Sequence, residues 1–271
     1  MKTEEAILSL LGSDPSLSRM WAMLDYIWDS MECNFQDRQK LAEYYSHPIW
    51  TINGFFTETH KDSVLNREAF TKYILSKSPK RIADYGGGFA ALSRMIAKAS
   101  PDIKIEIIEP YPSPKGVELC SEYPNISYVD KMSEKYDFII AVDVLEHLEK
   151  PFTLIEELSN YIEKEKGRLF LANCFYPVIK CHHPATFHLA NSFHVLMGKM
   201  GFKRLEKVLY AEVFVKKRDK IQYSRKIKRY ELLSEIRFEA SNIIKNTKSV
   251  LLKILGLLTL IDLFSKPFCL M

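Results

Sequence analysis

The chain has 271 residues, of which 47% are hydrophobic and 27% are charged, as in an ordinary globular protein. Its five cysteines include no CxxC pair, so we expect no disulfide framework and a reducing compartment such as the cytoplasm. The first residues, MKTEEAILSL, carry acids where a signal peptide carries basic residues, which predicts no export. The net charge of +4 is uneven: residues 216–271 carry 13 basic and 5 acidic side chains.

A helical cap is predicted for residues 1–77. The spacing of apolar residues predicts helices around residues 8–11, 20–31 and 66–75. Residues 47–56, HPIWTINGFF, are predicted to form a loop with bulky aromatic side chains. Three of these aromatics either form a lid over a flat or lipid-like substrate or pack the helices onto a sheet: Trp50, Phe55 and Phe56.

Residues 78–217 alternate between apolar runs and amphipathic stretches. Strands are predicted at residues 81–84, 103–109, 126–129, 136–141 and 168–172, with two more within 202–217. Several of these runs are almost continuously apolar, which is typical of parallel strands covered on both faces. Helices are predicted at residues 92–99, 151–162 and 193–200, the last one ending at Gly201. The alternation predicts an α/β fold with a doubly wound, mostly parallel sheet.

The tail, residues 218–271, begins as a predicted basic helix and ends in the apolar segment SVLLKILGLLTLIDLF (249–264). Lys253 and Asp262 interrupt that segment, and its uninterrupted part is too short for a bilayer span of about 20 residues. Three interpretations stay open: packing on the core, contact with a partner subunit, or peripheral contact with a membrane surface. No interleaved aromatic and basic residues indicate a specific nucleic-acid site.

A glycine-rich turn lies within residues 81–92, RIADYGGGFAAL. Asp84 ends an apolar strand, and Gly86, Gly87 and Gly88 precede a predicted helix, an arrangement that lets backbone approach a nucleotide-like ligand closely. The pattern also satisfies the dinucleotide fingerprint, so an NAD(P)-dependent oxidoreductase is one interpretation. Asp84, the position of the turn in mid-chain and the segment YDFIIAVDVLEHLEKP (136–151) argue against it.

Three features together resemble the class I S-adenosylmethionine-dependent methyltransferases: DYGGGFA (84–90), Glu109 after the second strand, and DVLEHL (143–148). The similarity covers residues 78–215 and is closest to the small-molecule branch that includes the quinone-biosynthesis O-methyltransferases. Ala90 departs from the family, which often has a third glycine there, although an alanine entering the helix still fits. The resemblance implies a Rossmann-like sheet with an antiparallel last strand, S-adenosylmethionine as cofactor, and a small-molecule acceptor. The acceptor atom is expected to be a hydroxyl oxygen of a glycan sugar, a specialised metabolite or a quinone-like lipid.

The resemblance also implies which residues bind the cofactor. Asp84 and the three glycines are expected to cradle its amino-acid end, and Glu109 to accept hydrogen bonds from both ribose hydroxyls. Asp130 either accepts from the adenine amino group or only forms a turn. Asp143 faces the transferred methyl group or the acceptor, or else caps a short helix.

A hydroxyl acceptor benefits from a general base, and histidine suits that task near neutral pH. The segment HPATFHLANSFHVLMGKMGF (183–202) resembles the family's, and His188 matches it best, with His183 as the second candidate. Each is alternatively a hydrogen-bonded loop histidine. Glu146 and His147 are expected mainly to brace their loop.

Cys174 and Cys181 lie near His182 and His183, which invites a zinc interpretation. The cysteines are not the close pair typical of structural zinc sites, so no metal is expected. We therefore expect a cap (1–77), a methyltransferase domain (78–217) and a helical tail (218–271). A non-catalytic adaptor that binds the cofactor or a membrane is the remaining alternative.

Overall fold

The computed structural model describes residues 16–254 of the chain. The chain divides into two compact units, residues 1–224 and 225–271. The described part of the second unit is one helix, α10 (Arg225–Ile254). The predicted helix at residues 8–11 and the end of the apolar segment, 255–264, lie outside the described residues. Within residues 16–254, no helix has the length and apolar character needed to cross a membrane. The predicted boundaries at residues 77/78 and 217/218 stay predictions.

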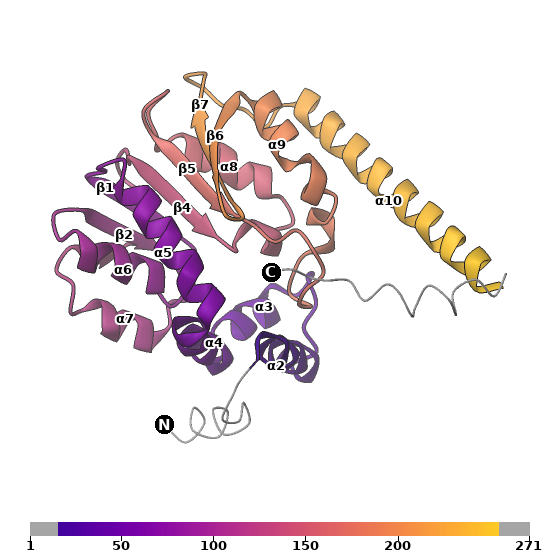
Figure 1. Cartoon of the computed structure of the whole chain (residues 1–271), viewed down its shortest axis with the longest axis horizontal. Coiled ribbons are helices and arrows are strands. Elements are labelled where there is room, and N and C mark those ends of the chain that lie inside the picture. Colours follow the sequence, from indigo (N-terminus) through magenta and orange to yellow (C-terminus); the bar gives the residue numbers. More distant parts are fainter. Residues whose placement is uncertain (1–15, 255–271) are drawn as a thin grey trace. The chain divides into compact units, whose positions relative to one another are not determined.

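The first unit is built around one seven-stranded sheet (Figure 1). The strand order is β3-β2-β1-β4-β5-β7-β6; the first five strands are parallel, and β7 pairs antiparallel with β5 and β6. The strands are β1 (Arg81–Tyr85), β2 (Lys104–Ile108), β3 (Ile126–Tyr128), β4 (Phe138–Val142), β5 (Arg168–Ala172), β6 (Phe202–Val208) and β7 (Ala211–Lys216). The Rossmann-like, mostly parallel sheet expected from the sequence is confirmed.

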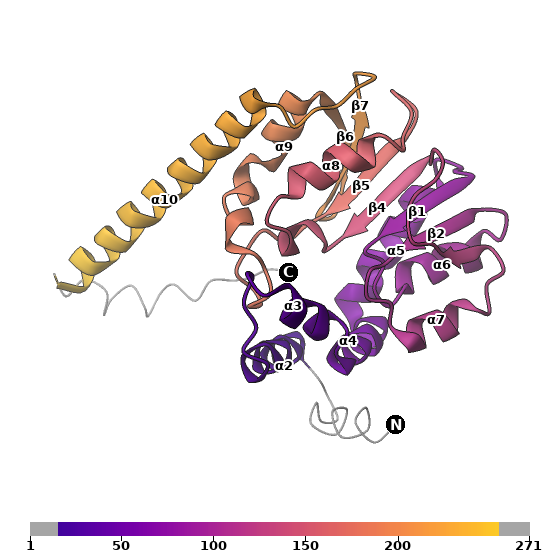
Figure 2. The ribbon, with the colours of Figure 1, turned by 180° about the vertical axis from the view of Figure 1, so that it is seen from behind.

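Helices cover both faces of this sheet because side chains alternate between the faces along each strand. Ile82, Phe138 and Phe170 join a buried cluster with Phe70 and Ile96 on one side. Figures 1 and 2 show α8 and α9 on the face opposite α5 and α6. The helices are α5 (Lys61–Leu75), α6 (Ala91–Ala99), α7 (Pro114–Cys120), α8 (Pro151–Ser159) and α9 (Leu189–Met200).

Three more helices lie near the edge at which the parallel strands end: α2 (Leu17–Ser30), α3 (Arg38–Tyr45) and α4 (Pro48–Thr59) (Figure 1). The loop predicted at residues 47–56 is wrong, because those residues begin α4. Pro48 occupies the first turn, and Nδ1 of His47 accepts a hydrogen bond from the Ile49 amide at 3.1 Å. Helix α3 and helix α7 are also absent from the sequence prediction.

The topology places the candidate site. The chain order reverses between β1 and β4, which are parallel neighbours with Asp84 opposite Ile140. In open α/β sheets a ligand crevice forms at such a reversal, outside the carboxyl ends of the strands. The glycine turn follows β1 there, and Asp143 follows β4.

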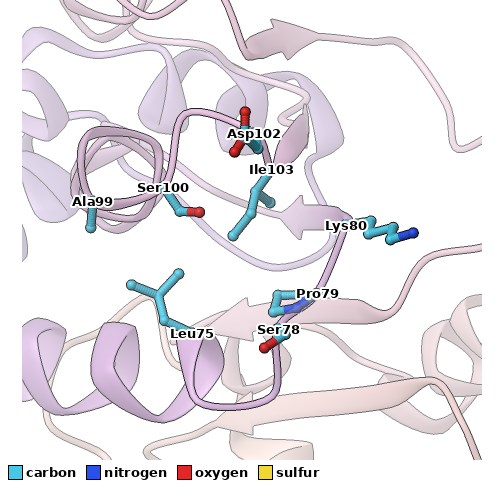
Figure 3. Close-up of a pocket in the computed structure, with 8 residues that line it drawn as sticks. All are labelled: Leu75, Ser78, Pro79, Lys80, Ala99, Ser100, Asp102 and Ile103. Atoms are coloured by element: carbon cyan, nitrogen blue, oxygen red, sulfur yellow. The ribbon is translucent and has the colours of Figure 1, made fainter.

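A separate hollow of about 320 Å³ lies at the opposite end of the strands, where β1 and β2 begin (Figure 3). Leu75, Pro79 and Ile103 give it an apolar part, and Lys80 and Asp102 lie at its margin. None of the residues expected to bind a cofactor lines this hollow, so it is distinct from the candidate site.

Substitution of two helical glycines tests how closely α4 packs against Phe89. A Cβ at Gly54 would lie 2.3 Å from Cγ of Phe89, whereas a Cβ at Gly198 in α9 meets no atom within 4 Å. Gly54→Ala is therefore expected to lower the melting temperature, since the Phe89 ring must move. Gly198→Ala, the matched control, should leave it unchanged or raise it by the equivalent of about 0.5–1 kcal/mol. Equal melting temperatures in thermal unfolding would contradict this packing of α4.

Candidate functional site

The glycine turn uses its three glycines for different physical reasons. Gly86 and Gly88 have positive φ angles of 69° and 52°, which glycine adopts without strain. A Cβ at Gly86 would lie 2.6 Å from Cγ2 of Val144, and one at Gly87 would lie 2.9 Å from Oδ2 of Asp84. A Cβ at Gly88 would meet nothing closer than the Gly86 carbonyl oxygen at 4.0 Å. The turn is thus packed on β1 and β4 and keeps open space beside Gly88.

Ala90 ends the turn in a strained conformation. It is the N-cap of α6, with a φ of 60°, and it is buried. The expectation that this alanine enters the helix is wrong: it precedes the helix in the left-handed region, where a Cβ costs about 1–2 kcal/mol. The family's glycine suits the same backbone without that cost.

The Glu109 carboxylate joins the ends of β1 and β2. Its Oε2 accepts a hydrogen bond from the Gly88 amide at 2.8 Å, and its Oε1 accepts one from the Tyr111 amide at 2.9 Å. A carboxylate offers about four acceptor positions, so each oxygen retains a lone pair for a further donor. Glu109 is half-buried, which leaves this acceptor edge reachable.

Asp84 lies beneath the turn, buried among protein atoms. The Ser93 hydroxyl donates to its Oδ2 at 2.6 Å. Burial raises the pKa of Asp84 to about 6, and the nearby Glu109 charge adds to the rise, while the Ser93 hydrogen bond opposes it. Asp84 therefore supports the turn from below.

Asp143 follows β4 with a positive φ of 53°. The Tyr210 hydroxyl, from the β6–β7 turn, donates to its Oδ2 at 3.2 Å. Part of the Asp143 side chain is exposed to solvent. The protein around its carboxyl group desolvates it and raises its pKa to about 6. Its alternative role as a helix cap is not observed, because Val144 precedes the short 3-10 helix Leu145–His147.

Glu146 is completely buried in that short helix. Its Oε1 accepts from the Cys174 amide at 2.8 Å, and its carbonyl oxygen accepts from the His183 amide at 2.7 Å. Its Oε2 has no hydrogen-bond partner among the described residues. Burial, followed by the Asp143 charge, raises the pKa of Glu146 to about 8. Glu146 therefore holds the segment after β5 while one carboxyl oxygen stays unpartnered.

His147 connects the same short helix to the cap. Its Nδ1 lies 3.1 Å from the Cys181 carbonyl oxygen and 3.3 Å from the Tyr45 hydroxyl. Because a carbonyl only accepts, this geometry assigns the imidazole proton to Nδ1. Burial lowers the pKa of His147 to about 4, so the ring is neutral at neutral pH. The Tyr45 ring in turn stacks on Tyr111, with centroids 5.8 Å apart.

The structure places the predicted bases away from open solvent. His188 is buried, and its burial lowers the pKa to about 4, an effect that the Ala185 backbone opposes. His183 is half-buried; its Nδ1 accepts from the Ala185 amide at 3.2 Å, and its ring packs on Phe35. Burial also lowers the pKa of His183.

The remaining residues that the sequence singled out differ in their exposure and contacts. Asp130 is exposed just beyond the end of β3, on the expected edge of the sheet. Phe56 is buried in the cap, and Phe55 packs on Phe89, so both serve packing. Trp50 instead packs edge-on against His147, with centroids 6.4 Å apart. Over residues 16–254, no group of three His, Cys, Asp or Glu side chains could hold a metal ion.

Tyr45, Tyr111 and Tyr210 are site residues that the sequence reasoning missed. Tyr45 of α3 and Tyr210 of the β6–β7 turn contact the site from elements distant in sequence, whereas Tyr111 closely follows Glu109 and stacks on Tyr45. An isolated tyrosine has no periodicity that reveals such contacts.

Comparisons with known proteins bear on the same region. The family model described as a methyltransferase domain matches residues 60–205. The ubiquinone biosynthesis O-methyltransferase of Haemophilus ducreyi (strain 35000HP / ATCC 700724) is 25% identical over 155 residues, which cover 50% of this chain and 64% of that protein. The match thus spans less than two thirds of the relative's length.

Two solved structures are similar at low sequence identity. The crystal structure of LaPhzM is 14% identical with a TM-score of 0.50, over 73% of this chain and 71% of that chain. The structure of PigF with SAH is 14% identical with a TM-score of 0.49, over 73% and 69%. The likeness to LaPhzM supports the fold described above.

Glu146→Gln is expected to change how stability depends on pH. The unfolded carboxyl group loses its proton near pH 4.5 and the folded one near pH 8, so ionisation of Glu146 lowers the free energy of unfolding as pH rises between these values. The buried histidines occur in every protein compared, so their own titration, which starts from an ordinary pKa of 6.5 in the unfolded state, cancels when slopes between pH 6.5 and pH 8 are compared.

Thermal unfolding across pH 6.5 to 8 should show a smaller fall in melting temperature for Glu146→Gln than for the wild type. Glu149→Gln replaces an exposed acid close in sequence and should keep the wild-type slope. The same slope in all three proteins would contradict the burial of an ionisable Glu146.

Proposed function

Because the chain belongs to the methyltransferase-domain family, in line with its resemblance to class I S-adenosylmethionine-dependent enzymes, we propose that it methylates a small molecule. S-adenosylmethionine is the proposed methyl donor, bound at the carboxyl ends of β1, β2 and β4. The family match favours this function over an NAD(P)-dependent oxidoreductase.

Glu109 is the observation that carries the proposal. Two backbone amides fix its carboxylate against the glycine turn, and its remaining lone pairs can accept both ribose hydroxyls. The open space beside Gly88 suits close approach of a ligand to the backbone. These residues therefore fit an adenosyl cofactor without rearrangement of the turn.

The proposed contacts to the rest of the donor lie at the same edge of the sheet. The exposed Asp130 lies beyond β3, where its carboxylate is proposed to accept from the adenine amino group. Gly86, Gly87 and Gly88 are proposed to cradle the amino-acid end, with Asp84 supporting them from below.

The bound donor supplies a methyl group activated by its positively charged sulfur. This chain's contribution is alignment of an acceptor with that methyl group, an effect worth about 7–11 kcal/mol when the reacting atoms are well oriented. Asp143 is the proposed residue nearest the reacting groups, since it is accessible and follows β4 beside the glycine turn.

A general base that accepts the proton of a hydroxyl acceptor is a second, smaller requirement of the proposed reaction. His188 and His183 remain proposals for it, although the low pKa of a buried imidazole weakens it as a proton acceptor at neutral pH. The raised pKa of Asp143 brings that carboxylate closer to neutral pH. On these grounds Asp143 is the stronger candidate of the three.

The acceptor is proposed to carry a hydroxyl group. The similarity to an O-methyltransferase of ubiquinone biosynthesis supports oxygen as the methylated atom. Stacked Tyr45 and Tyr111 are suited to contact a flat apolar group, and a quinone-like lipid, a specialised metabolite and a glycan sugar are the proposed classes. A cytoplasmic location remains a prediction from cysteine usage.

S-adenosylhomocysteine is expected to raise the melting temperature of the full chain, whereas NAD should not. Ligand at 100 times its dissociation constant stabilises by about 2.7 kcal/mol. The reverse result would contradict the proposed function. Binding without methylated product across a broad acceptor set would instead favour the non-catalytic adaptor.

Glu109→Ala is expected to weaken S-adenosylhomocysteine binding at least about tenfold, since it removes the ribose acceptor and releases two amides. Isothermal titration calorimetry measures this loss. Glu118→Ala, at an exposed acid on α7, is the control and should bind as the wild type does. Unchanged affinity in Glu109→Ala would refute the ribose assignment.

Peripheral membrane contact is proposed for α10. Its exposed apolar side chains include Leu232, Leu233, Ile236, Ile243 and Ile244, and the helix begins with basic residues. Full-length protein is expected to sediment with anionic phospholipid vesicles. Replacing both Ile243 and Ile244 with glutamate should reduce that fraction, and equal sedimentation would contradict the contact.

A further inference from the structure

An acidic group with no balancing cation lies where the methyl donor is proposed to end. Its members are Asp143, Glu146, Cys174 and Tyr210, from the ends of β4 and β5 and the β6–β7 turn. Among residues 16–254, Asp143 and Glu146 form no ion pair within 4.0 Å. The largest side-chain effects on the pKa values of these four groups come from one another.

Glu146 is the member of this group whose buried, unpartnered oxygen indicates a binding site. It is completely buried, its Oε1 is used by the Cys174 amide, and its Oε2 has no partner among the described residues. A buried carboxyl oxygen without a partner is costly unless something else satisfies it. Asp143, which accepts a hydrogen bond from Tyr210, is the exposed member of the group.

The glycine turn lies directly against this group. A Cβ at Gly86 would meet the Val144 side chain at 2.6 Å, and Val144 separates Asp143 from the short helix that contains Glu146. The end of the donor that Gly86–Gly88 are proposed to cradle is therefore adjacent to the two carboxyl groups.

We propose that the carboxyl groups of Asp143 and Glu146 form a patch that favours the methyl donor, whose sulfur is positively charged, over the product, whose sulfur is uncharged. Before a ligand binds, Glu146 is mostly protonated at neutral pH, so Asp143 supplies the negative charge, and a bound sulfonium then favours ionisation of Glu146. This inference rests on the proposed function. Opposite charges attract strongly in a partly desolvated site, so the sulfonium of the donor is favoured over the uncharged sulfur of S-adenosylhomocysteine. The α-ammonium group is common to both ligands and does not distinguish them. The patch then helps the protein to exchange spent product for fresh donor.

Three ligands test the patch on the full-length protein: S-adenosylmethionine, S-adenosylhomocysteine, and sinefungin, in which an amine-bearing carbon replaces the sulfonium centre. Calorimetry on the wild type should show both cationic ligands bound more tightly than S-adenosylhomocysteine. Asp143→Asn should lower that preference about tenfold while S-adenosylhomocysteine affinity changes less than about twofold. Glu146→Gln, which keeps an acceptor for the Cys174 amide, should lower it in the same direction.

Glu149→Gln is the control for loss of a nearby exposed acid and should keep the wild-type preference. An unchanged preference in both Asp143→Asn and Glu146→Gln would overturn the inference while leaving the proposed function intact. Loss of sinefungin affinity alone would also overturn it, since the carboxylates would then face the acceptor. So would a preference that requires an added divalent metal and disappears with a chelator. Failure of all three ligands to bind would refute the proposed function itself.

Discussion

The two hydrogen bonds to the Glu109 carboxylate are the constraint on which the site depends. They tie the Gly88 amide, after β1, to the end of β2. The Gly88 amide in the positive-φ turn would otherwise need water, and the same carboxylate satisfies it together with the Tyr111 amide after β2. The same residue thus shapes the loop and presents its remaining lone pairs outward.

A second carboxyl group, that of Glu146, also joins chain segments at the ends of two strands. Glu146 connects the end of β4 to the segment after β5 through its side chain and its carbonyl oxygen. His147 extends this connection to the Cys181 carbonyl and to Tyr45 of the cap. The family block DVLEHL therefore has a physical reason here: it fixes three chain segments around one edge of the sheet.

The strands and the glycine turn were predictable from the sequence because their signals are local. A continuous apolar run predicts a strand such as β4 wherever its neighbours lie, and three consecutive glycines predict a tight turn. The loop predicted at residues 47–56 overlooks helix α4, although Pro48 and the spacing of Ile49, Ile52 and Phe56 fit a helix. Gly54 is tolerated because the Phe89 ring fills the space beside it.

The site itself was only partly predictable. The positions of Glu109 and Asp143 follow from strand ends, but burial of Glu146 and His188 depends on chain packed from distant segments. Tyr210 and Tyr45 contact the site from 67 and 102 residues away in sequence. No spacing rule within one element reports such contacts, which is why the pKa changes that follow from them were not foreseen.

Several independent hydrogen bonds join the cap to segments at the edge where the parallel strands end, and these contacts bear on the proposed specificity. Thr51 hydrogen-bonds Ser113 at the start of α7, and Asp25 accepts from the Lys180 amide after β5. The cap therefore contacts both the segment that follows Glu109 and the segment after β5 that Glu146 holds. Since the donor is proposed to bind at the edge of the sheet, differences in acceptor among chains with this sheet are expected to arise in the cap and in residues 173–190. Such variation changes the acceptor while leaving the glycine turn and its carboxylate in place.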